Sequence, residues 1–176
     1  MDGYLWLMGT IRITLALLAS FSTYAYSSED CDILASLEAD PNSVSSPVAF
    51  NDINSSAVIY ACSKAITRND EHKPRFLLHR ARGYLKGGES NKAILDLEQS
   101  HNLGYPAATF GLATAYFLGD DVTQDLNKAK QLFIHAYEHG VLWSALGLSM
   151  LYSNEMYEDY DLEKAKNWET RFKDDS

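Results

Sequence analysis

GYPAATFGLATAYFLGDDVTQDLNKAKQLFIHAYEHG, residues 104–140, is the stretch that decides the fold. Small and aromatic residues recur at helical spacing over residues 106–118, and a polar turn follows them. After the turn, Asp125 can cap a second helix, and Gly140 is a typical residue to end it. The apolar stripe of this second helix consists of Ala129, Leu132, Phe133, Ala136 and Tyr137. The stretch therefore predicts two helices joined by a short turn.

The pattern recurs along the chain with an offset of 36 residues. The segment NKAKQLF (127–133) is echoed by NKAILDL (91–97) and by EKAKNWE (163–169). Equal residues at this offset are Gly104 and Gly140, Gly111 and Gly147, Tyr116 and Tyr152, and Asp125 and Asp161. A repeat of this length with helical patterning indicates an all-α array, because one helix pair does not bury its apolar stripe alone.

Residues 104–140 resemble a Sel-1-like repeat, a branch of the tetratricopeptide superfamily. The matching positions are Gly104, Ala108, Leu112, Tyr116, Gly119, Val122, Asp125, Ala129, Ala136 and Gly140. Residues 74–104 resemble an ordinary tetratricopeptide unit, in which Arg80 and Asp96 fall where such units often carry an ion pair between their helices. The resemblance implies a right-handed α/α solenoid. Its parts are a tetratricopeptide-like unit (74–104), a Sel-1-like repeat (105–140), and a terminal Sel-1-like repeat with a tail (141–176).

The N-terminal residues differ in composition from the rest of the chain. A small, apolar run ends at Thr23 and Ala25, which precede a plausible cleavage site, and this is typical of a secretory signal peptide. A retained membrane anchor is the alternative, although the uncharged run of residues 13–28 is shorter than the roughly 20 residues of a spanning helix. We expect residues 1–25 to direct export, and the mature protein to be periplasmic or secreted with no stable membrane insertion.

Two segments are expected between the signal peptide and the repeats. Residues 26–53 predict a short helix, which Asp32 can cap, and a loop; residues 54–73 predict a leader helix. The sequence has two cysteines, Cys31 and Cys62. In an oxidising compartment we expect them to form a disulfide that tethers residues 26–53, and two free buried thiols are the alternative.

Composition and motifs argue against several function classes. The net charge of −9 and the lack of a basic patch argue against nucleic-acid binding. The sequence has no G-x-S-x-G motif, no S-x-x-K motif and no Gly-rich phosphate loop, so we expect no cofactor. Some secreted, cysteine-rich Sel-1-like repeat proteins are described as β-lactamases. That activity is not carried over to a chain with one cysteine pair and no S-x-x-K motif.

The segment HAYEH (135–139) matches H-x-x-E-H, a motif of zinc peptidases. His135 and His139 share a helical flank, but a catalytic zinc site needs a third protein ligand and an open position for water. No third-ligand motif follows, and the preceding unit has QSHNL (99–103) at the same place. We interpret the two histidines as solvent-facing residues near the end of a repeat helix, and we expect no metal site.

The first helices of tetratricopeptide-type arrays line the concave face, and by that resemblance we predict a binding groove. Its residues are Arg75, Leu78, Arg82, Leu85, Ala107, Phe110, Thr114, Phe117, Trp143, Leu146 and Met150. Aromatic residues, Met and Arg on one face are typical of a groove for a peptide or a helix. The two arginines would favour an acidic motif or a C-terminal carboxylate. The alternative is that these residues pack against residues 29–53 of the same chain.

We therefore expect a non-catalytic protein that binds a protein or peptide, or serves as a scaffold, outside the cytoplasm. Its predicted anchors are Phe110, Phe117 and Trp143. The alternatives are a metal-dependent or cell-wall-acting hydrolase, and a secreted effector or inhibitor.

Overall fold

The computed structural model describes residues 28–68, 71–120 and 122–175, and the regular structure within these ranges is entirely helical. The helices are α1 (Ser28–Ala35), η1 (Phe50–Asp52), α2 (Ser55–Thr67), α3 (Lys73–Lys86), α4 (Ser90–Asn102), α5 (Pro106–Leu118), α6 (Leu126–Glu138), α7 (Trp143–Tyr152) and α8 (Leu162–Asp175). The all-α prediction is confirmed. The signal peptide expected at residues 1–25 lies outside the described residues.

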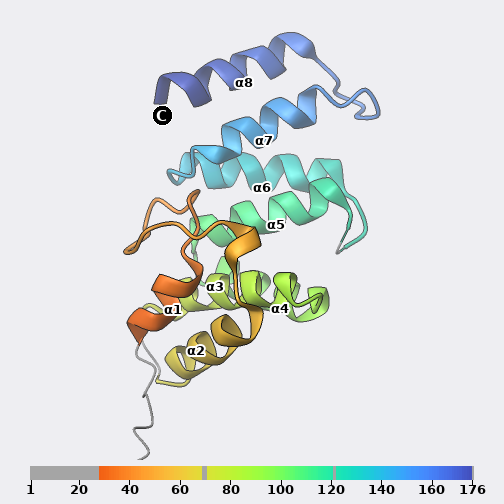
Figure 1. Cartoon of the computed structure of the whole chain (residues 1–176). Coiled ribbons are helices and arrows are strands. Elements are labelled where there is room, and N and C mark those ends of the chain that lie inside the picture. The colour runs from red at the N-terminus through yellow and green to blue at the C-terminus, as the bar shows by residue number, and fades with distance from the viewer. Residues whose placement is uncertain (1–27, 69–70, 121, 176) are drawn as a thin grey trace, which may run out of the picture.

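From α2 onward, each helix packs against the next one in the chain, and the helices form successive layers from α2 to α8 (Figure 1). The helices α3, α5 and α7 also contact each other in order, so they share one side of the array. The helix α1 packs across α2 and α3. The fold is therefore a helical array with an N-terminal segment laid against its first layers.

The repeated residues occupy equivalent places in successive helix pairs. Ala93, Ala129 and Ala165 are each the fourth residue of their helix, and all three are buried. Their small side chains let the neighbouring helices approach closely. Gly104 and Gly140 follow α4 and α6 with φ of +82° and +91°, a region that glycine adopts without steric cost. Helix capping follows the sequence as well, since the Asp125 side chain accepts a hydrogen bond from the Lys128 N–H at 2.8 Å.

Gly147 of α7 packs closely against Phe133 of α6. A Cβ atom at Gly147 would lie 2.6 Å from a ring carbon of the buried Phe133, whereas a Cβ atom at Gly111 would lie 3.0 Å from a terminal methyl of Leu97. We predict that Gly147→Ala lowers the free energy of unfolding by about 1–3 kcal/mol through overpacking. The matched change Gly111→Ala is expected to be within about 1 kcal/mol of neutral, because Leu97 can yield and alanine favours the helix. Urea denaturation measures both variants, and equal losses would contradict this packing.

Within the described part of the chain, every helix is too short or too polar to reach across a membrane.

Candidate binding face

A disulfide fixes the N-terminal segment to the array. Cys31 of α1 is bonded to Cys62 of α2, and both side chains are fully buried. The expected pairing of Cys31 with Cys62 is therefore confirmed. The bond brings the residues next to Cys31 against α3, where the predicted groove begins.

The second connection is a buried ion pair. The Arg75 side chain donates two hydrogen bonds to the Asp32 carboxylate, at 2.8 and 2.9 Å, and Nδ1 of His79 lies 3.3 Å from the same carboxylate. Burial opposes charge on Asp32, but the hydrogen bonds from His79 and Arg75 outweigh it and lower the pKa of Asp32. The expectation that Asp32 caps a helix is wrong. The helix α1 begins at Ser28, and Asp32 is an interior residue that points at α3.

The third connection is made by Arg82. Its guanidinium group donates hydrogen bonds to the backbone carbonyls of Ala35, Ser36 and Val48, at 2.7, 2.5 and 2.8 Å. Burial lowers the pKa of Arg82 to about 10, so the group is still protonated at neutral pH. These bonds satisfy carbonyl groups at the end of α1 and in the loop that follows it, and they hold residues 35–48 against α3.

The N-terminal segment reaches as far as the turn between α6 and α7. The Tyr105 hydroxyl donates to the Asp40 carboxylate at 2.6 Å, and Pro41 lies beside Gly140. We call residues 28–53 the N-terminal strap. The strap binds Arg75 and Arg82, so neither arginine is available to an acidic ligand. Leu78 is buried in a core cluster of α3, α4 and α5, against which Leu37 of the strap packs. This part of the predicted groove is therefore packed against its own chain.

The predicted groove residues of α5 are partly covered. Phe110 is half-buried and packs beside Ala39 of the strap, and its ring centroid lies 5.9 Å from that of Phe133. The Phe117 ring lies 6.3 Å from the same phenylalanine. Thr114 donates to the carbonyl of Phe110 and lines a small cavity of about 120 Å³ that Leu85 also lines. Phe110 and Phe117 therefore contribute to the packing of the array.

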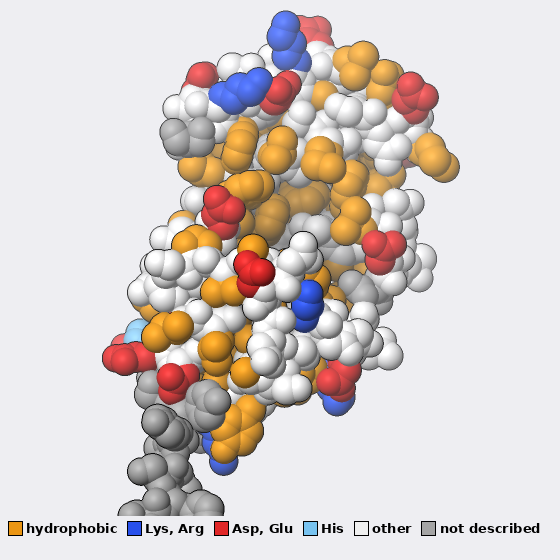
Figure 2. All heavy atoms as spheres, viewed as in Figure 1, with side chains coloured by type: hydrophobic (Ala, Val, Ile, Leu, Met, Phe, Trp, Pro, Cys, Tyr) orange, Lys and Arg blue, Asp and Glu red, His pale blue; other side chains and the backbone are white. Residues whose placement is uncertain are grey.

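The predicted residues of α7 are the most accessible part of the groove. Trp143, Leu146 and Met150 lie on one side of the helix, with Trp143 36 % and Met150 53 % exposed and Leu146 half-buried. Figure 2 shows hydrophobic side chains gathered over α7 and its neighbours, above the strap. We call these three residues the α7 face.

A cleft of about 360 Å³ opens between the strap and the end of the array. It is lined by Glu38, Ala39, Asp40, Pro41, Gly140, Leu142, Trp143 and Phe172. The ring of Trp143 lies against that of Phe172 on α8 in an edge-to-face arrangement, with centroids 5.5 Å apart. Trp143 thus belongs both to the α7 face and to this cleft, so a ligand could contact the two together.

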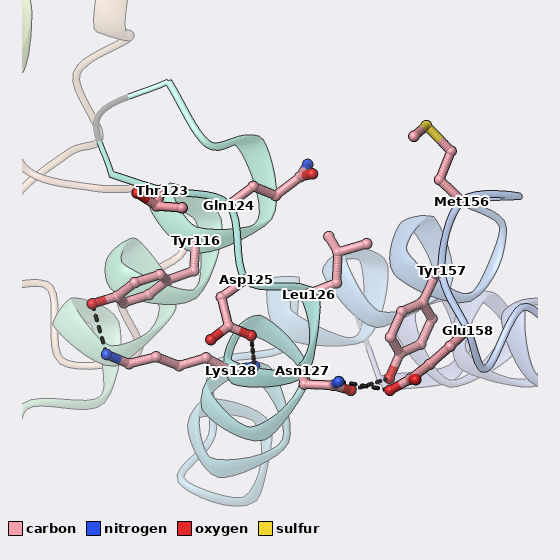
Figure 3. A pocket seen from close by; sticks show the side chains of 10 residues that line it. All are labelled: Tyr116, Thr123, Gln124, Asp125, Leu126, Asn127, Lys128, Met156, Tyr157 and Glu158. Carbon is pink, nitrogen blue, oxygen red and sulfur yellow. Dashed lines mark hydrogen bonds between the residues drawn. The ribbon is translucent and has the colours of Figure 1, made fainter.

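A larger hollow of about 560 Å³ lies where the α5–α6 and α7–α8 turns meet (Figure 3). Several of its polar side chains are hydrogen-bonded to each other. The Lys128 amine donates to the Tyr116 hydroxyl at 2.6 Å, and Asn127 donates to Glu158 and accepts from Tyr157. Because these groups already have partners, we interpret the hollow as a junction that joins the two turns.

The H-x-x-E-H segment lies on the exposed side of α6. The rings of His135 and His139 are stacked with centroids 4.3 Å apart, and Nδ1 of His139 lies 2.8 Å from the backbone carbonyl of His135. Glu138 is exposed. Over residues 28–68, 71–120 and 122–175, no group of three or more His, Cys, Asp or Glu side chains is arranged to hold a metal ion.

Residues that the sequence interpretation did not assign to the site are Glu38, Asp40, His79 and Phe172. Two sequence features indicate part of this set, namely the buried acidic partners of the arginines and Phe172. Arg75 and Arg82 interrupt an apolar run and require buried partners, and Phe172 continues the apolar spacing of Ala165 and Trp168.

The buried His79 predicts a pH dependence of stability. Its surroundings are Asp32 of α1, Asp40 of the strap, and Arg75 and Arg82 of α3; Nε2 has no hydrogen-bond partner among the described residues. Burial lowers the pKa of His79, although Asp32 opposes this. The unfolded chain therefore binds a proton below pH ~6.5 before the folded chain does, and the free energy of unfolding should fall as the pH falls through that value.

The lowered pKa of Asp32 also makes the free energy of unfolding fall as the pH falls, but only below about pH 4. Chemical denaturation between pH ~7 and ~5 should therefore show a slope that His79→Leu reduces. An unchanged slope in that variant would contradict the assignment to His79.

A scan against protein-family models gives no match for this sequence, and a search of curated proteins gives none either.

Proposed function

We propose that the protein is a non-catalytic helical-repeat protein that binds a protein or peptide through the α7 face. The main support for the proposal is the difference in accessibility between the groove sides of α3 and α7. The strap covers the groove side of α3, whereas Trp143 and Met150 stay accessible on α7. Exposed aromatic and Met side chains in one place are typical of interface cores.

We also propose that the array is a right-handed solenoid of the tetratricopeptide and Sel-1-like kind. Supporting this are the equivalent places of the residues at the 36-residue offset and the ion pair between Arg80 and Asp96, at 2.7 and 2.8 Å. The buried disulfide supports a site of action in an oxidising compartment, periplasmic or outside the cell.

Two methionines allow a matched test of the α7 face. Met150 belongs to it, whereas Met156 is 91 % exposed in the α7–α8 turn. Partner proteins are captured from the exporting cells and quantified by mass spectrometry with the wild type, Met150→Glu and Met156→Glu. We expect the first substitution to reduce the bound partner at least about tenfold, because it places a charge in an apolar contact, and the second to change it little. Equal capture by all three proteins would overturn the proposal.

A further inference from the structure

We propose that the cleft beside Trp143 binds a basic side chain, arginine or lysine, of the peptide that lies on the α7 face. This inference rests on the proposed function and specifies the chemistry of the ligand. It reverses the expectation of an acidic ligand, because Arg75 and Arg82 are occupied by the strap and the remaining cleft is acidic.

The charges that line the cleft are all negative. Its ionisable residues are Glu38 and Asp40, and no lysine or arginine lines it. Asp40 already accepts hydrogen bonds from Tyr105 and the N–H of Asn42, so it contributes mainly a negative field. Glu38 is exposed, and its carboxylate has no hydrogen bond or ion pair with any residue that the structure describes. Glu38 is therefore the carboxylate that a ligand can reach.

Three basic residues near the cleft already have other partners. Arg75 of α3 interacts electrostatically with Asp40, but its guanidinium is hydrogen-bonded to Asp32. On α8, the Arg171 guanidinium lies over the Trp168 ring at 4.6 Å, and the Lys173 amine contacts Glu169 at 2.6 Å. The C-terminus of α6 and the N-terminus of α7 meet beside the cleft, so their opposite helix-dipole ends largely cancel there. In a chain with a net charge of −9, the potential at this cleft favours a cation.

The walls of the cleft suit an amphipathic cation more than a metal ion. In the edge-to-face pair of Trp143 and Phe172, at least one ring keeps a face free of the other ring, and a cation can bind to such a face. Ala39, Pro41 and Leu142 provide apolar surface for the methylene groups of an arginine or lysine stem. A volume of about 360 Å³ is at the low end for ligand sites, which suits one side chain.

The distance between Trp143 and Met150 along α7 sets the spacing between the basic and the apolar residue of the peptide. Trp143 and Met150 are seven residues apart, which corresponds to about 10 Å along a helix axis. An extended peptide covers this length in about three residues. The expected motif therefore has a large apolar residue on Met150 and a basic residue about three positions away in the cleft.

The test uses three synthetic peptides with blocked ends, Leu-Ala-Ala-Arg, Leu-Ala-Ala-Gln and Leu-Ala-Ala-Glu, added to the full mature protein. NMR follows the Trp143 indole N–H and the Met150 methyl group, with the Trp168 indole as an internal reference. We expect the Arg peptide to bind about tenfold more tightly than the Gln peptide, and the Glu peptide to bind most weakly. Glu38→Gln should weaken the Arg peptide about threefold, whereas the matched change Glu155→Gln in the α7–α8 turn should not.

Equal affinities for the Arg and Gln peptides would overturn the inference about charge. If both peptides still shift the NMR signal of the Met150 methyl group, the α7 face remains supported as a binding surface. If the Arg peptide shifts Trp143 while Met150→Glu leaves partner capture unchanged, the proposed function fails and the cation cleft stands. Thermal melting of each variant confirms that it is folded.

Discussion

Replacing Asp32 by Ala is expected to lower the free energy of unfolding by about 3–5 kcal/mol. The substitution leaves the Arg75 guanidinium buried without its two hydrogen bonds to the carboxylate, and it removes the group beside Nδ1 of His79. An uncompensated buried charge costs more than the intact pair contributes, which is the reason for the large effect. Urea denaturation monitored by circular dichroism measures it.

Two further variants show whether the loss comes from the unpaired charge. Asp52→Ala changes an exposed aspartate of the same strap and should alter the free energy of unfolding by less than about 0.5 kcal/mol. The double variant Asp32→Leu with Arg75→Met removes both charges and should recover a large part of the loss. Recovery of the free energy of unfolding should be incomplete, because Leu at position 32 gives Nδ1 of His79 no polar partner. A double variant as unstable as Asp32→Ala would contradict this explanation.

Removing the disulfide is expected to lower the free energy of unfolding by about 3–4 kcal/mol. The bond joins residues separated by 31 positions and restricts the unfolded chain accordingly. The double variant Cys31→Ser with Cys62→Ser tests this by urea denaturation. Reduction of the wild type should bring it to the stability of the variant, and the same reductant should leave the variant unchanged. A wild type whose stability does not respond to reduction would contradict the structural role of the bond.

The repeat positions could be predicted from the sequence because their causes are local or periodic. The buried alanine of the second helix in each unit, the capping Asp125 and the positive-φ glycines Gly104 and Gly140 all recur at the 36-residue offset. The pairing of Cys31 with Cys62 was also predictable, since no other cysteine competes.

The residues that contact the predicted groove residues could not be predicted from the local sequence pattern. Asp32 resembles a cap when only its neighbours are considered, and its partner Arg75 is 43 residues away. The extent of the open face depends on the length of the strap, which reaches Gly140 through Pro41. For this reason Phe110 is half-buried beside the strap, whereas Trp143 and Met150, also predicted as groove residues, stay accessible.

The most direct test of the proposed binding surface is hydroxyl-radical footprinting of the protein alone and with a partner captured from the cells that produce it. In the free protein, Met150, Trp143 and Met156 should all be oxidised, while the buried Leu78 should be protected. In the complex, we expect oxidation of Met150 and Trp143 to fall sharply and that of Met156 to stay at its free level. Oxidation of Met150 that is unchanged by the partner, or protection that falls on Met156 instead, would contradict the assignment of the α7 face as the binding surface.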